Sequence, residues 1–252
     1  MARLRFSIRH VADVPTAQRT EMFEIFKQYY DLPEPDSFFR DFAAKDDVII
    51  LRDKKSGAIK GFSTQKILTH TIDGKTYTGI FSGDTIIDRA YWGDNTLGFG
   101  FFWYLIGQCG WSFRRKIYWH LISKGYKTYL LMANNFDRSY PRHDRPTPPF
   151  FQALSDDFAR QLYPTAYHKE RGLLLFDGPH EHLKTNVAPI TDDLKSRLPH
   201  VRFFADRNPN WQNGDELVCV AEFDLWVSFA FAKKVFLKGF KRLFFPKLRT
   251  SR

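Results

Sequence analysis

The chain has 252 residues and a net charge of +10, with 43% hydrophobic and 26% charged side chains, which excludes wholesale disorder. Two cysteines are too few for a disulfide framework or a cysteine-rich zinc site, and the aromatic share of 17% is high enough to line a large apolar cavity. No apolar run is long enough to span a bilayer and no secretory signal is recognisable, so we expect a cytoplasmic protein.

The first third of the chain predicts one strand and two helices followed by three strands. The hydrophobic spacing gives, in order, a strand over 3–10, helices over 16–30 and 36–44, and strands over 47–52, 58–71 and 75–88. Asp73-Gly74, between the last two strands, is a typical hairpin turn. These three strands should therefore form an antiparallel meander.

The middle of the chain predicts a crossover that returns to the same sheet. The expected elements are a helix over roughly 97–123, a strand over 127–133, a loop over 134–149, a helix over 150–162, a strand over 172–177, a helix over 192–198 and a strand over 216–223. A strand, a helix and a further strand in succession require parallel pairing. The expected fold class is a mixed, mostly antiparallel α/β sheet with one βαβ unit.

The positive charge is concentrated at the end of the chain. Eight basic and no acidic residues follow Asp224, whereas the preceding 224 residues hold 30 basic and 28 acidic side chains. We expect a domain over 1–177 and an extension over 178–252 that ends in a basic amphipathic helix at about 224–245. Its Phe-rich face opposite a lysine face suits an anionic membrane surface. The alternative is that the Phe face packs on the domain, and a nucleic-acid partner is not expected of a nearly neutral body.

The order of these elements resembles the GNAT acyltransferase superfamily. In this family a motif of approximately Tyr-Arg-Gly-x-Gly-x-Gly (or Ala) follows the third meander strand, and residues 91–98, Tyr-Trp-Gly-Asp-Asn-Thr-Leu-Gly, stand in that place. The resemblance covers 1–177, mainly through element order. It implies that backbone groups of Gly93, Asn95, Thr96 and Gly98 bind the phosphates of a thioester donor at a helix start.

Two departures from the motif affect the expected donor. Trp92 replaces the usual arginine, and Asp94 adds a carboxylate where phosphates would bind. The repulsion disfavours the pyrophosphate of coenzyme A (CoA) more than the single phosphodiester of an acyl carrier protein. We expect either an acyl carrier protein or acyl-CoA as co-substrate and no tightly bound cofactor.

The resemblance also implies a V-shaped opening between the third meander strand and the strand expected at 127–133. Exposed backbone groups there would polarise the thioester carbonyl. The helix after the motif is apolar nearly all round, from Phe99 to Trp111. Our hypothesis is that part of this wall contacts a long acyl chain, and the alternative is that it is only core.

Three residues are candidates for the chemistry. Asp84 lies in an apolar strand where burial would raise its pKa, and the family often places an acidic base on this strand. Asn135 and Tyr140 follow the next expected strand, near where the family keeps an asparagine and a tyrosine that protonates the leaving thiolate. Structural roles are the alternative for all three. The spacing of histidines and cysteines predicts no metal site.

Together these features predict an N-acyltransferase that moves an acyl group, with a long chain as the hypothesis, from a carrier-protein or CoA thioester to an amine. The protein would be cytoplasmic and peripheral on the inner face of the membrane. The alternative is a noncatalytic, GNAT-derived protein that binds lipid or the membrane surface.

Overall fold

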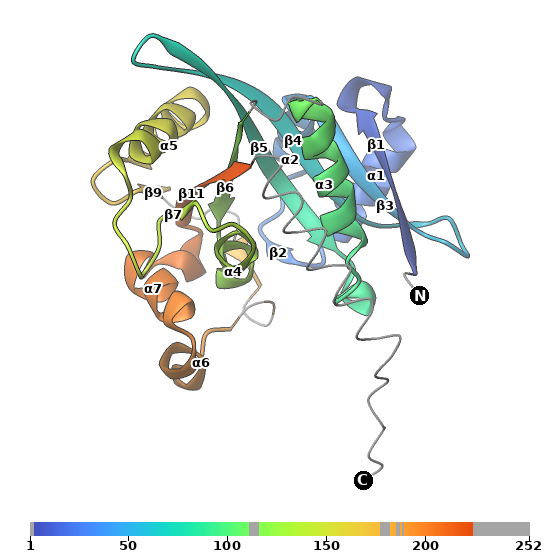
Figure 1. Ribbon diagram of the computed structural model, residues 1–252. Coiled ribbons are helices and arrows are strands. Elements are labelled where there is room, and N and C mark those ends of the chain that lie inside the picture. Colours follow the sequence, from blue (N-terminus) through green and yellow to red (C-terminus); the bar gives the residue numbers. More distant parts are fainter. Residues whose placement is uncertain (1–2, 111–115, 177–181, 185–186, 188, 224–252) are drawn as a thin grey trace, which may run out of the picture.

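The computed structural model describes residues 3–110, 116–176, 182–184, 187 and 189–223 (Figure 1). The strands are β1 (Leu4–His10), β2 (Tyr30–Asp31), β3 (Asp47–Asp53), β4 (Ile59–Ile72), β5 (Lys75–Ile87), β6 (Ile117–Ser123), β7 (Ser139–Tyr140), β8 (Tyr167–His168), β9 (Leu173–Leu174), β10 (His182–Leu183) and β11 (Glu216–Phe223). The helices are α1 (Thr16–Phe26), α2 (Pro35–Ala43), α3 (Thr96–Cys109), α4 (Tyr126–Asn135), α5 (Pro149–Leu162), α6 (Asp192–Arg197) and α7 (Pro199–Arg207). Short 3₁₀ turns are η1 (Val11–Asp13), η2 (Arg89–Tyr91) and η3 (Trp211–Asn213).

A nine-stranded sheet organises the molecule. Its strand order is β1-β3-β4-β5-β6-β11-β9-β8, with β7 paired to β11. Among the described strands only β5 and β6 pair in parallel, and α3 connects them as a crossover. The expected mixed and mostly antiparallel α/β fold with one βαβ unit is therefore confirmed.

The expectation of one helix over 97–123 is wrong. α3 ends at Cys109, Gly110 follows with φ of +63°, and residues 117–123 form β6. β6 is covered on both faces, so it has no alternation of polar and apolar residues. An apolar run without alternation cannot be distinguished from a buried helix by its period alone.

The strand expected over 127–133 is also wrong, because these residues belong to α4. Gly125 precedes the helix, and Tyr126, Tyr129 and Met132 follow each other at intervals of three residues on its buried side. The second arm of the opening is therefore β6. The loop expected over 134–149 contains the end of α4 and the short strand β7.

The two faces of the sheet are covered by different helices. In Figure 1, α3 and α4 lie in front of the sheet, and α1 and α2 lie behind it. α3, α4 and α7 pack on one side-chain face, which includes Ile80 and Trp119. α1 and α2 pack on the other face around Phe62, and α5 covers the same face further along, over Phe81 and Tyr118.

β11 connects the later part of the chain to the sheet. It lies between β6 and β9 and is buried along its whole length, although the sequence analysis assigns 216–223 to the extension. No helix within the described residues is long and apolar enough to cross a bilayer. The basic helix expected at 224–245 lies outside the described residues.

Candidate functional site

A cavity opens where β5 and β6 part. The two strands pair from Thr78 with Ile117 to Ser82 with Leu121, and β5 then continues to Ile87 paired with β4 but not with β6. A cavity of about 350 Å³ lies at this point, between α3 and α4. Its volume is within the range of about 300–1,000 Å³ that is usual for small-molecule sites.

The walls of this cavity are mostly apolar. α3 supplies Leu97, Phe99, Phe101, Phe102 and Leu105, α4 supplies Leu131, and Phe136 and Phe223 complete the lining. The ring of Trp119, on β6, packs 4.7 Å from that of Phe101 and 5.0 Å from that of Phe136, measured between centroids. Part of the large aromatic share of the sequence therefore lines this cavity.

Polar side chains on the sheet form one directional hydrogen-bond chain at the floor of the cavity. Trp119 Nε1 donates to Ser82 Oγ (2.9 Å), which donates to Gln65 Oε1 (2.8 Å). Gln65 Nε2 donates to Ser63 Oγ (2.7 Å), which lies 2.7 Å from Thr85 Oγ1. Thr85 Oγ1 in turn donates to the carbonyl oxygen of Gly83 (3.2 Å). The hydroxyls of the chain are thus satisfied from within the protein.

A β-bulge sits in β5 beside this chain. The register passes from Ser63 opposite Thr85 to Gln65 opposite Ser82, so two residues, Gly83 and Asp84, oppose one on β4. A bulge leaves a backbone group outside the ladder and is common beside active sites. A Cβ at Gly83 would lie 2.7 Å from Thr64 Oγ1 and 2.8 Å from Lys45 Cε, so a larger residue here requires these side chains to shift.

At the start of α3, Asp94 occupies the position expected for a donor phosphate. Its Oδ1 accepts from the backbone N–H of Thr96 (2.9 Å) and from the Thr96 hydroxyl (2.5 Å), and its Oδ2 accepts from Arg3 N (2.9 Å). Partial burial alone would raise the pKa of Asp94, but the hydrogen bonds from Thr96 and Arg3 outweigh it and lower the pKa. The carboxylate therefore stays charged where an incoming phosphate would otherwise bind.

The structure brings together some of the residues expected to bind the donor. Asn95 and Gly98 line the cavity beside Asp94. Thr96 is buried and bonded to Asp94, and Gly93 has φ of +86° and does not line the cavity.

The candidate catalytic residues are separated in space. Asn135, the last residue of α4, lines the cavity and donates from Nδ2 to Leu131 O (2.7 Å). Tyr140 pairs with Val220 of β11 and packs 4.6 Å from Phe151, in a separate apolar cluster. Asp84 lies in the bulge but is not among the residues that line the cavity.

Asp84 instead contributes, with two other carboxylates, to the electrostatic surroundings of a tyrosine that the sequence does not single out. Tyr163 follows α5 and packs 6.2 Å from Phe81 and 6.4 Å from Phe158 on the face opposite the cavity. Burial, and then the carboxylates of Glu216, Asp41 and Asp84, raise the pKa of Tyr163, so its hydroxyl is protonated at neutral pH. No sequence signal finds this residue, because α2, β5, α5 and β11 meet only in the folded sheet.

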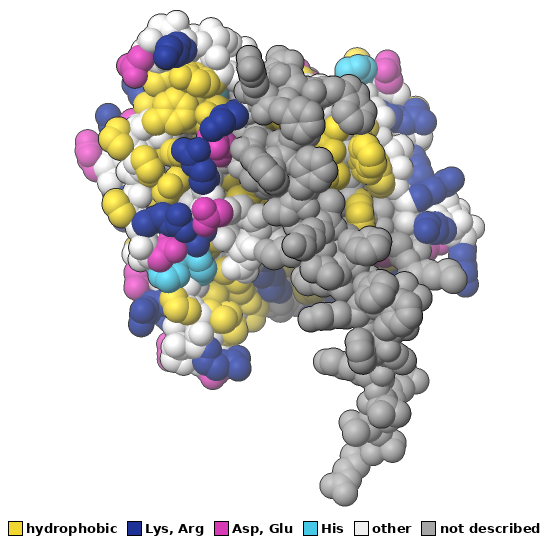
Figure 2. All heavy atoms as spheres, viewed as in Figure 1, with side chains coloured by type: hydrophobic (Ala, Val, Ile, Leu, Met, Phe, Trp, Pro, Cys, Tyr) yellow, Lys and Arg dark blue, Asp and Glu magenta, His cyan; other side chains and the backbone are white. Residues whose placement is uncertain are grey.

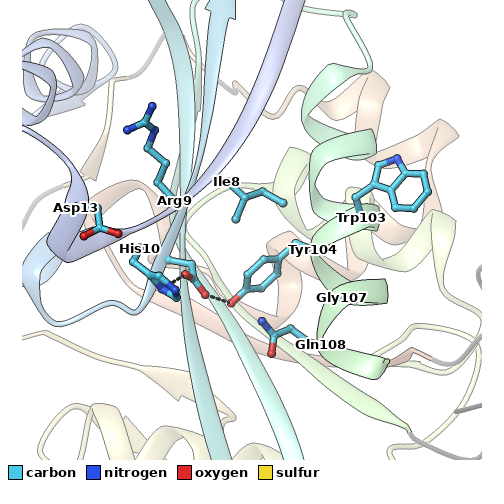
Figure 3. A pocket seen from close by; sticks show the side chains of 9 residues that line it. Ile8, Arg9, His10, Asp13, Trp103, Tyr104, Gly107 and Gln108 are labelled. Carbon is cyan, nitrogen blue, oxygen red and sulfur yellow. Dashed lines mark hydrogen bonds and ion pairs between the residues drawn. The ribbon is translucent and has the colours of Figure 1, made fainter. Parts of the chain in front are cut away.

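A second cavity of about 490 Å³ lies at the sheet edge, between β1 and the C-terminal half of α3 (Figure 3). The buried Asp47 carboxylate lies at its base, where it accepts from Tyr104 OH (2.9 Å) and pairs with His10 Nδ1 (2.7 Å). This groove lies away from the parting of β5 and β6.

Other catalytic chemistries find no support in the described part of the chain. It contains no group of three His, Cys, Asp or Glu residues that could hold a metal ion. Both cysteines are buried, and burial raises the pKa of the Cys219 thiol, which disfavours a reactive thiolate.

Comparison with known proteins gives structural likeness only. No family model matches the sequence, and no curated protein matches it. A probable N-acyltransferase of unknown function from Enterococcus faecalis matches 54% of this chain and 33% of its own, with 11% identity and a TM-score of 0.39. A GNAT family N-acetyltransferase from Escherichia coli, in complex with CoA, matches 52% of this chain and 67% of its own, with 12% identity and a TM-score of 0.36. A protein from Corynebacterium glutamicum described as histone acetyltransferase HPA2 and related acetyltransferase matches 57% of this chain and 90% of its own, with 12% identity and a TM-score of 0.35.

Proposed function

We propose that this chain, a divergent member of the GNAT superfamily by its fold, is an N-acyltransferase that moves an acyl group from a thioester to an amine. The observation that carries this proposal is the cavity at the point where β5 and β6 stop pairing. A thioester arm can lie in this opening, with its carbonyl near the bulge at Gly83 and Asp84. The donor is the thioester of an acyl carrier protein or of CoA.

A long acyl chain is the substrate class that the cavity walls favour. Phe101, Phe102 and Leu105 of α3 face the cavity, and the polar floor beneath them is already satisfied by its own hydrogen bonds. A hydrocarbon chain gains free energy by leaving water at such walls. Acyl-chain length should therefore change the apparent affinity for the donor.

Asp84 is our proposed base. The acceptor ammonium first loses one proton to water. The neutral nitrogen then bonds to the thioester carbon, the carbon–sulfur bond breaks, Asp84 takes the second proton, and the departing sulfur takes a proton from solvent. Asp84 raises the pKa of Tyr163, on the face opposite the cavity, together with Glu216 and Asp41. The charges of these last two are paired with Lys124 (3.8 Å) and Lys45 (2.5 Å). With Asp84 as the base, the acceptor would approach from the face opposite the cavity.

The substitution Asp84→Asn tests this proposal. We expect turnover of acyl thioesters with amines to fall by about 100-fold or more, with little change in KM for the thioester and unchanged circular dichroism. Asp73→Asn, in the hairpin turn between β4 and β5, is a matched control on the same ribbon. Retained turnover in Asp84→Asn eliminates it as the base.

A lipid-binding protein without catalysis is the second candidate, favoured by the self-satisfied floor of the cavity. In that case lipid co-purifies with the protein, and no acyl amide forms with any thioester donor. Mass spectrometry of the purified protein and of its reaction mixtures separates the two functions.

We also propose that the protein binds the anionic inner surface of the membrane. The charge pattern of 224–245 supports this, and so do exposed apolar side chains near the cavity: Phe99 and Leu131 in its lining, and Trp103 one turn from Phe99. Figure 2 shows hydrophobic side chains interspersed with Lys and Arg side chains on the side of this view where α5 and α7 lie.

A further inference from the structure

Two cations meet on one indole ring beside the open end of the cavity. Trp92 follows η2 and is 41% exposed. The Nζ of Lys127, in the first turn of α4, lies 4.6 Å from the centroid of its ring, and the Cζ of Arg89 lies 5.4 Å from it. Residues from two separate parts of the chain therefore place two positive charges against one ring.

Neither cation is neutralised within the described part of the chain. Asp88, next to Arg89, pairs with Lys60 (3.2 Å), and Lys127 Nζ donates to the carbonyl oxygen of Val187 (2.6 Å). Burial, and then the charge of Arg89, lower the pKa of Lys127, as expected for like charges held close together. An anion between them would relieve this repulsion.

The position of the pair fits the cavity. Trp92 Nε1 donates to the carbonyl oxygen of Ile87 (2.9 Å), and Ile87 lines the cavity, as does Thr128, the neighbour of Lys127. At the start of α3, the N–H of Thr96 is taken by Asp94. Arg89 and Lys127 thus offer a place for a phosphate that the helix start does not.

The distance along β5 matches the length of a pantetheine arm. From Ile87 to Ser82 the strand advances five residues, or about 16 Å. The arm has about twelve bonds between its phosphate and its sulfur, and an extended chain advances about 3.5 Å per three bonds, or about 14 Å in total. A phosphate at Arg89 and Lys127 would place the thioester near the bulge.

We propose that Arg89 and Lys127 bind the phosphate of the donor's pantetheine arm, with Trp92, whose ring both cations contact, as a positioning residue. This inference rests on the proposed acyl transfer. CoA and a carrier protein share this phosphate, and only CoA adds an adenosine with further phosphates.

The experiment compares pantetheine with phosphopantetheine, which differ by one phosphate. Calorimetry on the full chain should show that phosphopantetheine binds about tenfold tighter or more, as expected for charge-assisted hydrogen bonds. In the double variant Arg89→Gln/Lys127→Gln this ratio should fall close to one, with pantetheine affinity unchanged. Lys54→Gln/Lys55→Gln removes two exposed charges from the turn between β3 and β4 and should keep the wild-type ratio.

Three outcomes overturn the inference. A wild-type ratio near one, or a ratio that the double variant keeps, overturns the phosphate site and leaves acyl transfer standing if thioesters are still turned over. Binding of neither probe, together with no turnover, overturns the phosphate site and acyl transfer together.

The affinity for CoA distinguishes the two possible donors, CoA and a carrier protein. CoA that binds no tighter than phosphopantetheine assigns the site to a carrier protein, and tighter binding assigns it to CoA. Asp94→Ala frees the Thr96 N–H, so it should strengthen CoA binding.

Discussion

Gly83 shows how one missing side chain shapes the candidate site. The Cε of Lys45 passes over this residue at a distance that no Cβ would allow, and Lys45 Nζ then reaches Asp41 Oδ2 (2.5 Å) and the ring of Phe81. The carbonyl oxygen of Gly83 accepts from the hydroxyl of Thr85 on the other side of the strand. The bulge is therefore held from both faces of the sheet.

Replacing Gly83 with alanine should destabilise the protein by about 1–3 kcal/mol, since the added carbon overlaps Thr64 and Lys45. Urea unfolding measures the change. The matched control is Gly107→Ala, because a Cβ at Gly107 of α3 meets nothing within 4 Å and should stabilise the helix by about 0.5–1 kcal/mol. Equal stability of Gly83→Ala and wild type would contradict the tight packing at the bulge.

At the scale of elements, the C-terminal segment of the sequence carries the charge that the membrane proposal needs. Deleting 233–252 removes eight basic residues and no acidic one. Each lysine or arginine near an anionic surface contributes about 1 kcal/mol, so sedimentation with anionic vesicles should fall by more than about tenfold. Vesicles of phosphatidylcholine alone serve as the control, because they lack the negative charge. Binding that is unaffected by the deletion removes the membrane proposal.

The local patterns that the sequence could predict are those bounded by clear turn residues, such as Asp73-Gly74 and Asn213-Gly214. The strands at 47–53, 59–72 and 75–87 follow their predicted bounds closely, and the strand at 216–223 matches them residue for residue. β6 and α4 could not be separated from pattern alone, because β6 is buried on both faces and α4 is a short apolar run.

The candidate site shows the same limit. Asp84, Asn95, Gly98 and Asn135 come from local sequence, and the last three line the cavity. Tyr163 could not be predicted, since its role depends on contacts between elements far apart in the chain.

At the scale of the whole molecule, a buried histidine pair links the fold to pH. His70 and His120 are both fully buried beneath α5, with ring centroids 4.8 Å apart. Asp157 Oδ2, on α5, accepts from His70 Nδ1 (2.8 Å), whereas both nitrogens of His120 and Nε2 of His70 have no partner within the described structure. Burial lowers the pKa of both histidines; the charge of His70 lowers that of His120 further, and Asp157 partly opposes the shift at His70.

These shifts predict that stability falls on acidification. In the unfolded chain a histidine has a pKa of about 6.5. Below that pH the unfolded state binds protons that the folded state, with its lowered histidine pKa values, does not bind. The free energy of unfolding therefore falls by up to about 1.4 kcal/mol per pH unit for each histidine. Above that pH this contribution to stability is fully present.

His120→Phe should reduce this loss between pH 7 and pH 5, because a phenyl ring can keep the stacking on Phe158 and cannot take up a proton. Urea unfolding at a series of pH values measures the slope. His168→Gln, at an exposed position on β8, is the control and should leave the slope unchanged. An unaltered slope in His120→Phe would show that the pair does not set the acid sensitivity.

The one-way order of donors beneath the cavity has a consequence for ligand choice. Ser82, Ser63 and Thr85 each commit their single hydroxyl hydrogen to a neighbour inside the protein. A carbonyl that arrives at this floor obtains a hydrogen only if one of these hydroxyls rotates away from its present acceptor. We therefore expect the backbone of the bulge, rather than these hydroxyls, to polarise the carbonyl of a reacting thioester.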